Sequence, residues 1–271
     1  MTVTDDQSPN LSHDALPADC EWAAFTETAP WVLCADSIAW SRGLEVVRDQ
    51  AKAEVPKLTR PGKVPNIGRM IVVVGRIGWA VGNWWVRKRL RRFSSTEASR
   101  SDLSRRLRSA IESLGATYIK LAQIISSGDG LFPGELVDEF KKCRDQVPAE
   151  NFDVVKRTIE RDLGRPLNEV FQSIDPAELA AASIAQVHRA TLLDGTEVVI
   201  KVQRPDVARL VRTDLKVMAW LAPHLVGRIP VAALANPPAL VELFAETIVE
   251  ELDFRLEAAN MVDVAKVLND L

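Results

Sequence analysis

The dipeptide Asp194-Gly195 constrains the fold of this chain more than any other feature. Both central positions of a type I′ turn need positive φ, which Asp-Gly supplies, and such a turn joins two antiparallel strands. The residues after it, 197–202, are mostly β-branched and apolar but include one lysine, Lys201. The sequence therefore predicts a β-hairpin whose second strand carries a cation, and an alanine-rich loop from Ala180 precedes that hairpin.

Lys201 has two interpretations. A lysine among Val199, Ile200 and Val202 is unfavourable to bury unless an anion meets it. Protein kinases place such a lysine, in the motif V-A-I-K, beside nucleotide phosphates and a glutamate of the next helix. Alternatively, the lysine lies on an edge strand with its ammonium group in water, as most strand lysines do. The four letters V-V-I-K do not by themselves decide between the two.

Composition excludes several classes of protein. A net charge of -3 over 271 residues argues against a general nucleic-acid binder, so no nucleic-acid partner is expected. The cysteines are few and widely spaced, which indicates neither a disulfide framework nor a metal site (Cys20, Cys34 and Cys143). No basic segment followed by an apolar core opens the chain, so we expect a cytoplasmic protein rather than a secreted one.

The N-terminal quarter of the chain is expected to lack a packed core. Residues 1–20 are polar and acidic and are expected to be disordered. Residues 49–65 are charged and interrupted by prolines, which is typical of a linker. We therefore expect residues 1–66 to form an irregular region and linker.

The most apolar stretch is Met70–Val86, and the basic run RKRLRR follows it. Its 17 residues include Arg76 and Asn83, so it is short and polar for a membrane span. Tryptophans beside basic residues are typical of a helix that lies at a membrane surface. A buried helix with a solvated basic turn is the third alternative. We assign residues 67–95 to this helix and leave surface contact, spanning and plain packing open.

Helices are expected over residues 96–165. Leu and Ile recur at helical spacing from Leu103 to Ile125, and Gly115 marks a junction between two helices. Within this stretch Lys120 and Gln123 share a face that is not the apolar stripe. Two shorter helices follow, and a further long helix is expected over 238–269 with an acidic stripe. Such a stripe is usually a solvated face, unless a strand lysine needs a carboxylate.

Four segments, in this order, resemble the UbiB-type (aarF-domain) atypical kinase-like family. They are LGATYIKLAQIISS (114–127), similar to that family's K-x-G-Q signature, PAELAAASIAQVHRA (176–190), similar to its alanine-rich loop, VVIKVQRP (198–205), and EELDFRLEAANM (250–261), which carries an E-x-D motif. The resemblance covers residues 100–271. Two small departures are Ala122 and Ala185, each where the family has glycine.

The resemblance implies an α+β fold, a kinase-like N-lobe with a small antiparallel sheet and a long helix, over residues 166–271. An α-helical N-terminal extension carrying the K-x-A-Q motif would occupy 96–165. It implies a site for ATP or ADP with Mg, covered by the loop residues Ala180, Ala181, Ala182 and Ser183. Lys201 would pair with Glu257 and position the phosphates. Lys120 and Gln123 would lie across the active site, and Glu251 and Asp253 would contact that segment or the metal.

Two physical points qualify these roles. Positions two apart on a helix point about 200° from each other, so Glu251 and Asp253 cannot face one partner on an intact helix. Either a helix begins nearby or the two residues act differently. Alanine also restricts the close approach and positive φ that glycine allows, so the loop should hold nucleotide differently, with an altered preference between ATP and ADP.

The sequence up to its last residue, Leu271, does not decide whether the protein is an enzyme. No catalytic-loop aspartate and no D-F-G segment precede it, and phosphoryl transfer depends on both. We expect no catalytic or metal-binding residue in this chain and no catalysis by it alone. One hypothesis is an ATPase or atypical kinase that supports isoprenoid quinone or lipid metabolism at a membrane. The other is a non-catalytic module that binds nucleotide, a lipid or membrane surface, or a partner protein that covers the N-lobe.

Overall fold

The structure is a computed structural model that describes residues 24–25, 32–33, 43–60, 65–128, 130–143, 149–226 and 236–269. The chain divides into two compact units, Ala53–Ile248 and the pair of segments Met1–Lys52 and Val249–Leu271. The disorder expected for residues 1–20 lies outside the described residues. The domain boundaries expected at 66, 95 and 165 stay predictions.

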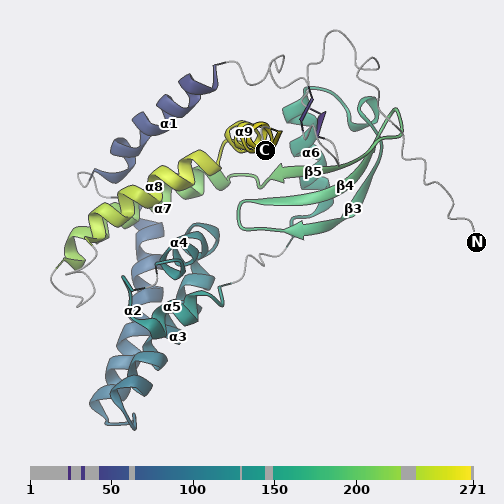
Figure 1. Ribbon diagram of the computed structural model, residues 1–271. Coiled ribbons are helices and arrows are strands. Elements are labelled where there is room, and N and C mark those ends of the chain that lie inside the picture. Colours follow the sequence, from purple (N-terminus) through teal and green to yellow (C-terminus); the bar gives the residue numbers. More distant parts are fainter. Residues whose placement is uncertain are drawn as a thin grey trace, which may run out of the picture. The chain divides into compact units, whose positions relative to one another are not determined.

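Helices make up the first half of the larger unit. They are α2 (Ile67–Arg89), α3 (Thr96–Leu114), α4 (Ala116–Ser126) and α5 (Gly134–Phe140), joined later in the chain by α7 (Val207–Leu225). Helices α2 and α3 lie side by side, α3 also packs on α4 and α5, and α7 contacts α2 and α4 (Figure 1). Ser95 starts α3, because its hydroxyl accepts a hydrogen bond from Ala98 N at 3.0 Å.

A buried ion pair connects three of these helices. Arg69 of α2 donates from Nε and Nη2 to the two carboxylate oxygens of Asp214 on α7, at 2.6 and 3.0 Å. Its Nη2 also donates to the carbonyl of Leu114 at the end of α3, at 2.7 Å. The Asp214 side chain is fully buried. The pair therefore fixes where α2, α3 and α7 meet.

The junction predicted at Gly115 is confirmed. Helix α3 ends at Leu114, α4 begins at Ala116, and Gly115 between them has a φ of 95° and a ψ of -166°. Only glycine adopts that region without strain. The bend turns the apolar stripe of the sequence into two separately packed helices.

The second half of the larger unit holds an antiparallel sheet in the order β3-β4-β5. The strands are β3 (Phe171–Ala181), β4 (Ala185–Leu192) and β5 (Glu197–Gln203). The predicted hairpin is confirmed, but its turn type is wrong: Gly195 alone has positive φ, and Gly195 N donates to Leu192 O at 3.0 Å. That bond makes Leu193 and Asp194 the central residues of a type I turn, and Gly195 follows in the left-handed region.

Strand β3 was not expected from the sequence. Pro176 lies inside it, and a proline cannot donate to a sheet ladder. The strand forms because it is an edge strand of the described sheet and because register shifts between Ile174 and Glu178 accommodate the proline. Ala180 and Ala181, expected in a loop, are its last two residues.

Helix α6 (Phe152–Leu163) packs on one face of the sheet. The core there contains Val155 and Ile159 of α6 and Val202 of β5. The helix ends at Gly164, which is left-handed, as its sequence predicts, and the short 3-10 helix η3 (Leu167–Glu169) leads to β3. The sequence predicts α6 as the second of the two shorter helices, but it does not predict that the helix packs on the sheet.

Two expectations about helices were wrong. The expected linker at 49–65 is helical up to Thr59 in α1 (Leu44–Thr59), because Pro56 comes only in its last turn. The expected long helix at 238–269 is two helices, α8 (Pro237–Glu251) and α9 (Phe254–Asn269). Short strands β1 (Ala24–Phe25) and β2 (Val32–Leu33) pair with each other, and α9 contacts β2 within the smaller unit.

Candidate functional site

One row of residues runs across all three strands of the sheet. Ala180 of β3 is paired with Val187 of β4, and Val187 is paired with Lys201 of β5. Residues paired in this way point to the same face of a sheet. That face is opposite the one that carries Val202 onto α6, since Lys201 and Val202 are neighbours in one strand. The alanine-rich segment and the strand lysine therefore share the face that α6 does not cover.

Lys201 is exposed on this face, and so is its near neighbour Val199, with 63% of its surface accessible. Strand β5 is an edge strand of the described sheet. An edge position and an exposed side chain agree with a solvated lysine as well as with a ligand-binding one. The placement of Lys201 in one row with Ala180, rather than the exposure, is what favours a ligand.

Arg204 holds the turn between β3 and β4. Its Nε donates to Ala182 O at 3.0 Å, and its backbone N donates to Ile184 O at 2.9 Å. Its Nη1 also donates to Glu150 at 3.0 Å, and the side chain is only 8% exposed. The residue that follows the lysine strand therefore fixes the alanine-rich turn, which the sequence analysis missed. The signal available was an arginine directly before Pro205.

The turn is closed by its own backbone as well. Ala182 N donates to Ala185 O at 2.8 Å, so this amide is not available to a phosphate. Ser183 is buried in the turn. Of the four residues expected to cover a nucleotide, only Ala182 and Ser183 lie in the loop.

A buried polar network supports the other face of the sheet. Gln186 Nε2 donates to His188 Nε2 at 2.9 Å, which leaves the imidazole proton on Nδ1, 2.9 Å from Asp175 O. Gln186 Oε1 accepts from Glu150 N at 2.8 Å, and the His188 ring contacts Phe152 of α6. Both side chains are almost fully buried. This network joins β3, β4 and α6, and it supports the sheet on the face opposite Lys201.

The remaining predicted site residues lie on three helices. Lys120 and Gln123 are half-buried on α4, in the larger unit. Glu251 ends α8 and Glu257 lies exposed in α9, both in the smaller unit. The proposed pairing of Glu257 with Lys201 stays a prediction.

Asp253 lies at the start of a helix, so the two acidic residues of the E-x-D motif are not on one intact helix. It precedes α9, and its Oδ1 accepts from Arg255 N at 3.0 Å. The Arg255 guanidinium also donates to both carboxylate oxygens. These bonds hold the pKa of Asp253 below its ordinary value, although partial burial opposes them. A helix therefore begins beside the motif, one of the two alternatives that the helical wheel left open.

The described part of the chain gives little support for a reactive cysteine or a metal site. Burial raises the pKa of the Cys143 thiol to about 11, so the thiol is protonated and unreactive near neutral pH. No group of three or more His, Cys, Asp or Glu side chains among the described residues is arranged to hold a metal ion.

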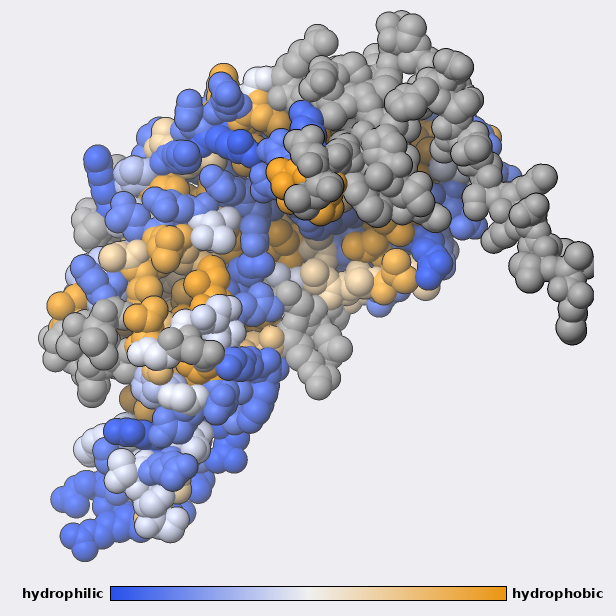
Figure 2. All heavy atoms as spheres, in the orientation of Figure 1, coloured by the Kyte–Doolittle hydropathy of each residue, from blue (hydrophilic) through white to orange (hydrophobic). Residues whose placement is uncertain are grey.

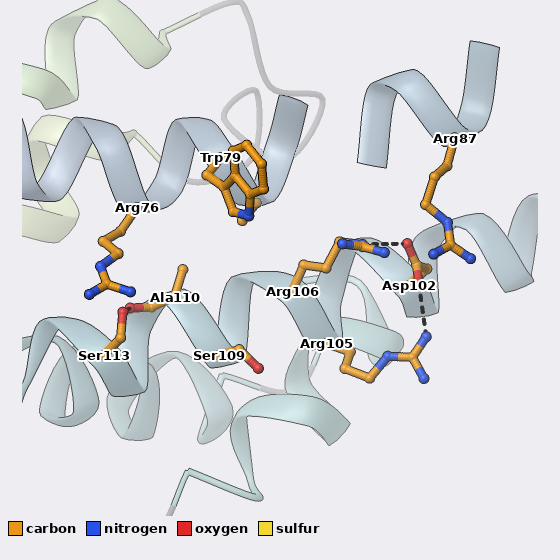
Figure 3. A pocket seen from close by; sticks show the side chains of 10 residues that line it. Arg76, Trp79, Arg87, Asp102, Arg105, Arg106, Ser109, Ala110 and Ser113 are labelled. Carbon is orange, nitrogen blue, oxygen red and sulfur yellow. Dashed lines mark hydrogen bonds and ion pairs between the residues drawn. The ribbon is translucent and has the colours of Figure 1, made fainter. Parts of the chain in front are cut away.

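A cavity with a volume of about 580 Å³ lies between α2 and α3 (Figure 3). Four arginines and Asp102 are among the residues that line it (Arg76, Arg87, Arg105 and Arg106). None of the residues predicted for the nucleotide site lines it. The sequence analysis noted the basic run after Val86 but could not pair it with α3, because that pairing depends on how two helices pack.

Taken together, the fold has the class of a kinase-like N-lobe with an α-helical extension before it. An antiparallel sheet carries the lysine on its third described strand, after an alanine-rich turn, and α6 backs the sheet. Residues 142–271 match the ABC1 atypical kinase-like domain. The resemblance of this segment to UbiB-type atypical kinase-like proteins is therefore confirmed.

The chain is similar to proteins named "Probable protein kinase UbiB". It is 39% identical over 170 residues to the protein from Photobacterium profundum, a match that covers 62% of this chain and 31% of that protein. It is 39% identical over 165 residues to the one from Vibrio parahaemolyticus, covering 60% and 30%. For Marinobacter nauticus the identity is 38% over 168 residues, covering 62% and 30%. The match thus spans less than a third of each curated relative.

Proposed function

We propose that the face of the sheet bearing Lys201 binds ATP or ADP with magnesium, as part of an atypical kinase or ATPase. The observation that carries the proposal is the row Ala180–Val187–Lys201, which sets a lysine on the same face of the sheet as the alanine-rich segment. The ammonium group would hold phosphate oxygens, and Glu257 would orient the lysine. The relatives' name, a probable protein kinase, agrees with a nucleotide ligand.

The residues fit a nucleotide in part. Lys201 supplies an exposed cation, and Arg204 holds the turn in a fixed conformation. The backbone amide of Ala182 already donates to Ala185 O, so it cannot donate to a phosphate as the amides of a glycine-rich loop do. We therefore propose weaker phosphate contacts than in a glycine-rich loop, with a changed preference between ATP and ADP. Support of isoprenoid quinone or lipid metabolism belongs to the same proposal.

Calorimetric titration of the 271-residue chain with MgATP and MgADP tests the proposal. We expect binding of one nucleotide per chain and unequal affinities for the two nucleotides. A chain that is folded by circular dichroism and takes up neither nucleotide would contradict it, and the binding-module alternative would then stand.

The alternative is a non-catalytic module that binds a membrane surface, a lipid or a partner protein. Helix α2 favours the surface: Trp79 and Trp85 are 75% and 58% exposed, and Ile71 is exposed as well. Exposed apolar side chains beside basic residues are typical of a helix at a membrane surface. In the described part of the chain, no helix is both long and apolar enough to cross a bilayer. Helix α9 exposes Met261 and Val264, which favours a partner protein in the same way.

A further inference from the structure

The cavity between α2 and α3 has an excess of positive charge. Its four arginines are opposed by one carboxylate, Asp102, which gives the lining side chains a net charge of +3. Asp102 accepts from Arg106 Nε at 2.7 Å and from Arg105 Nη2 at 2.9 Å (Figure 3). Burial alone would raise its pKa, but these bonds hold the pKa below its ordinary value, so Asp102 is ionised at neutral pH. It fixes two of the arginines and neutralises one charge.

The other two arginines have unused donors. Arg87 Nε is buried and has no hydrogen-bond acceptor among the described residues, although its guanidinium lies 5.9 Å from the Phe93 ring. A buried donor without an acceptor is destabilising. Arg76 is exposed at the other end of the cavity, and it forms no ion pair with a described side chain. Both guanidiniums extend from α2 toward α3 (Figure 3).

We propose that this cavity binds a phosphate group, and that the group is the headgroup of an anionic phospholipid. Guanidiniums bind phosphate oxygens through paired, charge-assisted hydrogen bonds, which this arrangement of donors can provide. Hydrophilic residues gather over this end of the helical pair, shown in blue in Figure 2.

A lipid fits better than free phosphate because of what borders the cavity. Trp79 is part of its lining and is 75% exposed, so an apolar ring stands beside the cations. Indole rings at headgroup level, with arginines beside them, are typical of membrane-surface helices. The inference deepens the membrane-surface alternative given above and is independent of nucleotide binding.

The test compares two double variants of the full chain that remove equal charge. In the first, R76Q and R87Q, both residues line the cavity. In the second, R89Q and R92Q, both residues belong to the same basic run as Arg87, 87–92, but neither lines the cavity. Each variant is sedimented with vesicles of phosphatidylcholine alone, whose phosphate is paired with its own ammonium, and with vesicles that also contain phosphatidic acid. Circular dichroism verifies that both variants fold.

We expect the wild-type chain to prefer the phosphatidic acid vesicles. The affinity for these vesicles should fall about tenfold further in the lining variant (R76Q with R87Q) than in the control variant (R89Q with R92Q). A tenfold difference corresponds to about one charge-assisted hydrogen bond. The difference should persist at raised ionic strength, where attraction between exposed charges is screened. Equal losses in the two variants would overturn the site, since they would indicate surface charge alone.

The remaining outcomes separate this site from the membrane-surface proposal. Equal binding of the wild type to both kinds of vesicle would overturn the phosphate site and leave the membrane contact standing. The chain could bind neither kind of vesicle while inorganic phosphate raises the melting temperature of the wild type and not of the lining variant. In that case the cavity binds phosphate, and its assignment to a lipid headgroup is wrong. If neither vesicles nor phosphate bind, both proposals fail.

Discussion

Replacing Lys201 by alanine is expected to weaken MgATP binding by about ten- to a hundredfold. Hydrogen bonds to charged groups contribute about 1.5–3 kcal/mol, and each 1.4 kcal/mol is about a factor of ten in affinity. Because Lys201 is exposed on the sheet face away from α6, its removal should leave the fold intact. Calorimetric titration of wild type and variant measures the change.

Arg189 offers a matched control for that experiment. It is exposed on the same face of the sheet as Lys201, since Arg189 is paired with Val199 and Val187 with Lys201. Arg189→Ala removes the same charge from the next row of the sheet, outside the Ala180–Val187–Lys201 row. We expect it to lower the affinity much less. Equal affinity in wild type and Lys201→Ala would mean that Lys201 is a solvated edge-strand lysine.

Replacing Asp214 by alanine is expected to lower the free energy of unfolding by about 3–5 kcal/mol. The variant leaves Arg69 partly buried with its carboxylate partner removed, and among the described residues the Leu114 carbonyl is then the remaining hydrogen-bond acceptor of its guanidinium. An uncompensated charge inside a protein is more destabilising than the loss of an ordinary contact. Chemical denaturation followed by circular dichroism measures the effect.

Two further variants make the cause specific. Arg209 of α7 forms an exposed pair with Asp206, and Arg209→Ala should change the stability by less than about 1 kcal/mol. The double variant Arg69→Met with Asp214→Leu replaces both charges by apolar groups of similar size and should recover most of the loss. A double variant no more stable than Asp214→Ala would show that the pair itself, and not the stranded charge, holds α2 to α7.

Local chemistry accounts for the parts of the fold that the sequence predicts well. Asp194-Gly195 specifies a hairpin, Gly115 a junction and Gly164 a helix end, because each depends on the backbone freedom of one residue. Strand β3 could not be predicted in this way. Pro176 argues against a strand, and only its edge position in the finished sheet makes the proline acceptable.

The candidate site is likewise predictable only in part. Lys201 and the alanine-rich segment can be recognised from the local sequence. The register that places Ala180 and Lys201 in one row depends on how three strands pair. The roles of Arg204 and the α2–α3 arginines depend on contacts between distant segments. No periodicity or motif in a single segment encodes such contacts. The break between α8 and α9 at Asp253 is intermediate: the helical wheel raised it as an alternative but could not choose it.

The most direct test of the nucleotide site is chemical labelling of the full chain with an acyl phosphate of ATP. The amine nearest the bound phosphates attacks the acyl carbon, an amide forms, the acyl–oxygen bond breaks and ATP leaves. Mass spectrometry then identifies the modified lysine. We predict that Lys201 is labelled and that excess MgATP protects it. Labelling of Lys201 no stronger than that of the exposed Lys216, or labelling that MgATP does not suppress, would contradict the account.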